Sequence, residues 1–183
     1  VIEIPTIRPL WPAGPVLQPP VAAGVGGRPV ANLTLALNHA LSGVQPWSYH
    51  VLNVLLHGAV ALAWYGVVRR TLETLAPRER WARVAHPLAL ASAVIWAVHP
   101  LATAVVNYVS QRTEGLMALG ALATLYAFIR SATTRTGSSG WRAVAVGACG
   151  LGMACKETMV VVPLLVLLYD RAFIAGTWGA VWR

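Results

Sequence analysis

Charged residues are scarce in this sequence. Only 11% of its 183 residues are charged and 57% are hydrophobic, whereas soluble domains carry about 25% charged residues. This shortage excludes an ordinary soluble domain and indicates a membrane protein. The net charge of +8 would suggest nucleic-acid binding in a soluble protein. Here the arginines lie between long apolar runs, so they indicate orientation in a membrane, and we expect no nucleic-acid partner.

Cysteine is equally rare, with Cys149 and Cys155 in one apolar segment. Six positions apart on a helix, they point to different faces, so we expect buried free thiols and no disulfide or metal pair. The spacings between His39, His50 and His57 match no usual zinc pattern. These patterns argue against a metal site built from cysteine or clustered histidine.

The N-terminal part is rich in proline and glycine, which favours extended loop over helix. We expect residues 1–46 to form an extracytoplasmic loop that contains a short amphipathic helix at 31–43, lying on the membrane surface. The chain shows no signal peptide and opens on loop sequence. We therefore expect a fragment from which an upstream helix is missing.

The remainder, 47–183, is expected to be an all-α polytopic bundle of membrane helices. Long apolar runs predict these elements: spans at about 47–68, 87–106 and 113–130, and short helices at 142–155 and 158–169. The last two are separated by Lys156-Glu157. A single tilted helix with this pair in mid-membrane is the alternative, and the sequence leaves both interpretations open.

Basic residues predict the orientation. The loops at 69–86 and 130–142 hold most of the arginines, so the positive-inside rule places them in the cytoplasm. The polar residues of the other ends would then share the extracytoplasmic side. They are Glu3, Arg8, Arg28, His39, His50, His99, Arg112, Glu114, Lys156 and Glu157.

Lys156 and Glu157 are the most unusual of these, because they interrupt an apolar run. Neighbours on a helix point about 100° apart, so each charge needs a partner from elsewhere, and Arg112 and Glu114 are the obvious candidates. Cations at headgroup depth suit a lipid phosphate, and a carboxylate can hold a metal or sugar hydroxyl or take a proton. The alternatives are a plain interfacial turn at 156–157, a structural Arg112–Glu114 pair, and a helix break at His99-Pro100.

Four stretches, in this order, carry a family likeness: GRPVANLTLALNHALSG, WSYHVLNVLLH, WAVHPLATAVVNYVSQRTEGLMAL and GLGMACKETMVVVPLLVLLYDRAF. Together they resemble the transmembrane and tetratricopeptide-repeat protein family, whose membrane part resembles a GT-C glycosyltransferase. Animal members are O-mannosyltransferases, and bacteria have many relatives. The resemblance implies a fragment of an integral membrane glycosyltransferase, in a bacterial inner membrane. It would move a sugar, with mannose the leading candidate, from a polyprenyl-phosphate carrier in the membrane lipid to an extracytoplasmic protein or glycan acceptor.

The resemblance also implies roles for individual residues. The family's His-Pro and later Arg-x-acid patterns match His99-Pro100 and Arg112-Thr113-Glu114, and its Lys-Glu pair and Arg-Pro match Lys156-Glu157 and Arg28-Pro29. Glu114 would be the catalytic acidic residue, in contact with the sugar or with a divalent metal, and no other cofactor is expected. Arg28, Arg112 and Lys156 would bind the phosphate, Glu157 would orient Lys156, and His99 would contact substrate.

The sequence departs from the family in three places. The family's acidic pair, which contains the expected base, would precede Val1, and Glu3 is not a convincing substitute. Residues 101–104 lack the carboxylate often found after the His-Pro, and the tetratricopeptide repeats are absent. We therefore expect this chain alone to be inactive, and two rival functions stay open: a non-catalytic membrane scaffold and a transporter segment with a broken substrate-binding helix.

Overall fold

The computed structural model describes residues 5–8, 10–11, 13–19, 26–75, 78–134 and 136–181. Over these residues the chain is helical and has no strand, which confirms the all-α prediction. The longer helices are α2 (Pro29–Ser42), α3 (Pro46–Thr74), α4 (Arg78–Ala97), α6 (Arg112–Thr133), α7 (Ser138–Met153) and α8 (Val162–Tyr169). Shorter elements are η1 (Pro5–Ile7), α1 (Ala13–Leu17), η2 (Pro100–Ala102), α5 (Thr103–Asn107), η3 (Val109–Gln111), η4 (Glu157–Val161), η5 (Asp170–Ile174) and α9 (Trp178–Val181).

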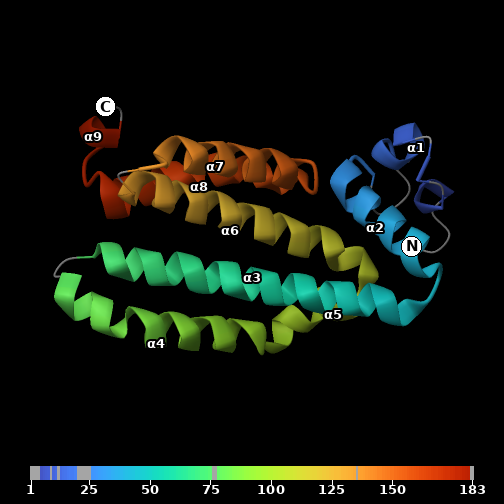
Figure 1. The fold of residues 1–183 in the computed structure, drawn as a ribbon, viewed down its shortest axis with the longest axis horizontal. Coiled ribbons are helices and arrows are strands. Elements are labelled where there is room, and N and C mark those ends of the chain that lie inside the picture. Colours follow the sequence, from blue (N-terminus) through green and yellow to red (C-terminus); the bar gives the residue numbers. More distant parts are fainter. Residues whose placement is uncertain are drawn as a thin grey trace.

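The long helices lie roughly along one direction, with α3 between α4 and α6 and with α7 packed on α6 (Figure 1). At one end, on the right of Figure 1, α2 and the N-terminal elements meet the starts of α3 and α6. We call this the α2 end. At the other, which we call the α9 end, α3 leads into α4, α6 leads into α7, and the C-terminal helix follows. The fold thus separates two groups of loops by the length of α3.

Among the described residues, two helical segments are long and apolar enough to cross a membrane: Pro46–Thr74 and Val109–Thr133. A third span would consist of Glu79–Ala97 and Pro100–Asn107, which are bent by 59° where His99 interrupts the expected span at 87–106. Apolar side chains such as Leu62 on α3 and Val146 on α7 are 71% and 74% exposed. Such surfaces are stable in a lipid environment, so the chain is an integral membrane protein.

The apolar block at 142–169 forms two helices in the structure. Helix α7 ends at Met153, Lys156 is extended with φ −160° and ψ 136°, and η4 then leads into α8. The amides of Cys155 and Lys156 both donate to the carbonyl of Gly152 at 3.0 Å, which closes the turn. The break lies at the α2 end (Figure 1), because α7 starts at the α9 end.

Small residues allow this hairpin to approach α6. A Cβ on Gly120 would lie 3.0 Å from the Cα of Gly152 in the facing helix, and a Cβ on Gly152 would lie 2.7 Å from Cε of the fully buried Met159. Close helix contacts through small residues are typical of membrane bundles. Both cysteines are free thiols; Cys155 is buried and Cys149 is half-buried.

The helix expected at 31–43 is α2, which starts two residues earlier. Pro29 occupies its first turn, where a missing N–H costs nothing. The chain leaves it at Gly43, whose φ of 60° suits glycine and whose amide donates to the His39 carbonyl at 2.7 Å. Its inner face packs in a core with the N-terminal elements and α3: Ile7, Val16, Leu35, Ala36 and Tyr49. Glu3 lies outside the described residues.

Candidate functional site

Arg112 is the most buried charge that the structure describes, with 2% exposure at the start of α6. Its Nε donates to Oδ1 of Asn53 at 2.9 Å, and its Nη2 donates to Oδ1 of Asn38 at 2.9 Å and to the carbonyl of Tyr49 at 3.2 Å. Its Nη1 donates to the carbonyl of Thr34 at 3.3 Å. The guanidinium group also lies over the Tyr49 ring, 5.6 Å from the centroid. One side chain thus joins α2, α3 and α6.

The two asparagine side chains are themselves held in position. Nδ2 of Asn53 donates to backbone carbonyls at 3.3 to 3.5 Å, those of Val105, Val106 and Tyr108. Nδ2 of Asn38 donates to the hydroxyls of Ser42 and Ser48 at 3.2 and 3.1 Å. Because the amide nitrogens are committed, both amide oxygens face Arg112. No role was predicted for these asparagines from the sequence, although polar residues within apolar helices were the available signal.

The phosphate contact expected for Arg112 stays a prediction, but this geometry favours a structural role. Its four hydrogen bonds involve all three guanidinium nitrogens and are accepted by uncharged protein oxygens. A phosphate could reach the group only by displacing some of them, and each donor left unpaired in a buried site would cost stability. The expected alternative of an Arg112–Glu114 pair is wrong, since Glu114 accepts from another cation.

That cation is Lys156, whose Nζ donates to Oε1 of Glu114. The two side chains are 18% and 33% exposed. Glu114 lies in the first turn of α6, where the helix dipole favours a negative charge, and Lys156 lies in the break before η4. The partner that the sequence predicted for one half of the Lys-Glu pair is therefore confirmed.

Glu157 finds its partner in a different segment from the one expected. Its Oε1 accepts from Nη2 of Arg28 at 3.2 Å, with the two side chains 73% and 23% exposed. Arg28 precedes α2, and the next turn is tied to the same break by a 3.3 Å hydrogen bond from the amide of Val30 to the carbonyl of Ala154. The pKa of the Glu157 carboxyl lies below its usual range, because it accepts hydrogen bonds from its own backbone amide and from Arg28.

The α2 end thus carries two ion pairs on adjacent residues of one turn. Lys156–Glu114 is half-buried, and Arg28–Glu157 is more open to the surroundings. These four residues come from three separate stretches of sequence, and the structure brings all of them together. Since Glu114 and Glu157 meet their cations at partly exposed positions, an incoming anion can compete with these carboxylates for Lys156 and Arg28.

His99 lies at the bend that follows α4. Its side chain is exposed, and Nδ1 accepts from the amide of Leu101 at 3.2 Å, which caps η2 at the bend after α4. Among the described residues, the hydrogen-bonded groups around Arg112 and Lys156 do not include it. This placement agrees with a helix break, and its role in substrate binding stays a prediction.

The part of the chain that the structure describes contains no group of three or more His, Cys, Asp or Glu residues placed to hold a metal. Glu114, the residue expected as a ligand, is occupied by Lys156. A divalent metal at this position therefore stays a prediction.

Comparisons with known proteins find a family and relatives that match the region that contains this site. A family model described as "Dolichyl-phosphate-mannose-protein mannosyltransferase" matches residues 26–182. Protein O-mannosyl-transferase TMTC2 of Mus musculus is 34% identical over 147 residues, 78% of this chain and 16% of that protein. Protein O-mannosyl-transferase TMTC3 of Homo sapiens is 29% identical over 150 residues, 81% of this chain and 15% of that protein.

The chain thus spans about a sixth of the length of these curated relatives. No solved structure matches it. The family model covers the described parts of α2 through α9, and with them both ion pairs and the Arg112 network. The chain therefore belongs to the dolichyl-phosphate-mannose-protein mannosyltransferase family.

Proposed function

We propose that this chain binds the phosphate of a polyprenyl-phosphate sugar donor in a membrane mannosyltransferase, which transfers the sugar to an extracytoplasmic protein or glycan acceptor. The observation that carries the proposal is the pair of partly exposed ion pairs, Lys156–Glu114 and Arg28–Glu157, at one end of the bundle. Relatives named protein O-mannosyl-transferases support the reaction class. The family description, which contains dolichyl-phosphate-mannose, supports the donor class.

The proposed roles follow from the contacts. Lys156 and Arg28 exchange their carboxylate partners for the oxygens of the donor phosphate, because charge-assisted hydrogen bonds to phosphate are strong and arginine matches phosphate bidentately. Glu114, released from Lys156, then turns to the sugar or to a divalent metal. Before the phosphate binds, Glu157 holds Arg28 at the site, in place of the Lys156 contact expected from sequence.

Arg112 is given a positioning role. Its hydrogen bonds fix the starts of α3 and α6 against α2, and Glu114 lies two residues farther along α6. A side chain that holds these elements sets the distance between Glu114 and the turn that bears Lys156. No residue of this chain is assigned as the base that deprotonates the acceptor.

The orientation of the site is also part of the proposal. The α9 end bears most of the arginines with described side chains: Arg69, Arg70, Arg80, Arg83, Arg130, Arg142 and Arg171. The positive-inside rule places such an end in the cytoplasm. The α2 end and its ion pairs then face the extracytoplasmic side, where polyprenyl-linked sugars are used, in the bacterial inner membrane that the resemblance implies.

The test is sugar transfer by the full-length protein that carries this sequence, in membranes supplied with polyprenyl-phosphate-mannose. Glu114→Gln and Lys156→Ala should each lower the rate about tenfold to a hundredfold, the value of one hydrogen bond to a charged group. Arg142→Ala, which removes an exposed charge at the α9 end, is the matched control and should leave the rate unchanged. Thermal unfolding of each variant shows whether a lost rate reflects a lost fold.

Other outcomes would select the rival functions. Wild-type rates in folded Glu114→Gln and Lys156→Ala variants would refute the proposed site. If the wild-type protein transfers no sugar but still binds the acceptor, it is a scaffold. Accumulation of a solute inside vesicles without sugar transfer would identify a transporter.

A further inference from the structure

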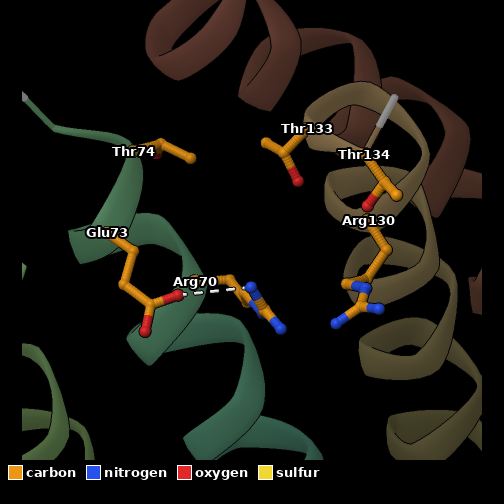
Figure 2. A pocket seen from close by; sticks show the side chains of 6 residues that line it. All are labelled: Arg70, Glu73, Thr74, Arg130, Thr133 and Thr134. Atoms are coloured by element: carbon orange, nitrogen blue, oxygen red, sulfur yellow. Dashed lines mark hydrogen bonds and ion pairs between the residues drawn. The ribbon is translucent and has the colours of Figure 1, made fainter. Parts of the chain in front are cut away.

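A polar pocket of about 320 Å³ lies at the α9 end, away from the proposed sugar-transfer site. The ends of α3 and α6 line it, and Figure 2 shows the side chains of Arg70, Glu73, Thr74, Arg130, Thr133 and Thr134. A single water needs only about 10–15 Å³ of such space. The pocket is therefore large enough for a headgroup.

Two cations face each other in this pocket. Figure 2 shows the guanidinium groups of Arg70 and Arg130 extending toward one another from the two helices. Like charges that face each other in a partly desolvated site repel, and an anion placed between them relieves that repulsion. The arrangement is thus suited to an anionic ligand.

Arg130 also has an unused hydrogen-bonding group. Its guanidinium lies over the Trp141 ring, 4.8 Å from the centroid. Its Nε is buried and has no hydrogen-bond partner among the described residues. Buried donors of charged groups are normally satisfied, so this nitrogen is a donor that a ligand in the pocket can use.

The single carboxylate of the lining does not neutralise the pocket. Glu73 accepts from Nε of Arg69 at 2.8 Å and from Nη1 of Arg70 at 3.3 Å. Figure 2 shows it on the side of Arg70 that faces away from Arg130. The lining therefore holds two arginines and one carboxylate, which Arg69 also contacts, and the charge that remains is positive.

The threonines make the walls of the pocket polar, but two of their hydroxyls already donate hydrogen bonds within the protein. The hydroxyls of Thr74 and Thr133 donate to carbonyls of their own helices, those of Thr71 and Ile129, both at 2.7 Å. An anion would thus depend on the two arginines, whose planar donor forks match the oxygens of a phosphate.

We propose that this pocket binds the phosphate of an anionic lipid headgroup in the leaflet at the α9 end. It lies where the candidate spans Pro46–Thr74 and Val109–Thr133 both end, at headgroup depth. Basic pockets between membrane helices attract anionic headgroups, and the arginine-rich surroundings strengthen that attraction. A soluble phosphate shares this chemistry, and the experiment separates the two sources.

The experiment uses the purified protein in phosphatidylcholine nanodiscs with and without phosphatidylglycerol, and measures retained phosphatidylglycerol by native mass spectrometry. The double variant Arg70→Gln/Arg130→Gln should retain about tenfold less phosphatidylglycerol than the wild type. The control Arg83→Gln/Arg142→Gln removes the same charge from exposed positions at the same end and should retain the wild-type amount. Equal loss in both double variants, or loss in neither, would overturn the proposal.

Two further arms complete the test. Arg130→Lys keeps the charge and lacks the planar fork, so it should bind phosphatidylglycerol more weakly than the wild type even if the double variant fails to fold. Inorganic phosphate added to phosphatidylcholine nanodiscs should not raise the unfolding temperature as phosphatidylglycerol does. If free phosphate stabilises the protein equally well, the ligand of the pocket is a soluble anion and the lipid proposal is wrong.

Discussion

Arg28 and Glu157 lie 129 positions apart in the sequence, and their side chains meet at 3.2 Å. This ion pair joins the segment before α2 to the turn between α7 and α8. The neighbouring Lys156–Glu114 pair joins the same turn to α6. Together the two pairs bring the charges of three distant segments to one end of a membrane bundle, and they set the first testable consequence.

Exchanging the charges of Lys156 and Glu114 separates structure from function. The single variants Lys156→Glu and Glu114→Lys place like charges together and should lower thermal stability. The double exchange restores an ion pair, so its stability should return to within about 1 kcal/mol of the wild type, while mannose transfer by the full-length protein stays lost. A double exchange that transfers sugar at the wild-type rate would mean that the pair serves the fold alone.

Arg112→Lys should destabilise the protein by about 2–4 kcal/mol, because an ammonium cannot satisfy the fixed oxygens of Asn38 and Asn53 at the same time. Thermal unfolding in detergent measures the effect, and the exposed Arg142→Lys is the control, with no expected change. If Arg112→Lys unfolds like the wild type and yet loses transfer, Arg112 acts on the substrate as the sequence predicted.

Gly120→Ala should separate α6 from the α7–α8 hairpin, since the new Cβ would meet the backbone of Gly152 at 3.0 Å. Overpacking of this kind costs about 1–3 kcal/mol, measured as a lower unfolding temperature. Gly147→Ala on α7 is the matched control, because a Cβ there meets nothing within 4 Å. Equal stability of the two variants would show that the helices do not pack so closely.

The Arg28–Glu157 contact should respond to pH in a defined direction. The pKa of the Glu157 carboxyl is lowered in the folded protein, so its contribution is present above the ordinary glutamate pKa of about 4.3 and is lost as pH falls through the lowered value. Hydrogen exchange at the Val30 amide, which bonds to Ala154 across the same junction, measures the contact. Protection should weaken only in acid for the wild type.

Glu157→Gln is the control for this effect. It lacks the titrating group, so protection at Val30 should be lower near neutral pH and should show no further loss attributable to position 157 in acid. An identical pH profile in the wild type and Glu157→Gln would contradict the assignment.

Local sequence properties were sufficient to predict that this protein is a helical membrane protein. Hydropathy over runs of about 20 residues predicted membrane helices, and the position of the arginines predicted which loops gather at one end. The need of Lys156 for a distant carboxylate was also predicted, but from helix geometry, whereas Lys156 is extended in the structure.

Tertiary structure decided which groups meet. Packing places Glu157 beside Arg28 and surrounds Arg112 with neutral oxygens, and it places Arg70 and Arg130 on the wall of a shared pocket. It also brings Gly120 against Gly152. Sequence alone determined the pattern of polar, small and apolar residues along each helix, because this pattern is a local property of the chain. Their partners depend on how whole helices pack, and that packing is set by contacts between residues far apart in the chain.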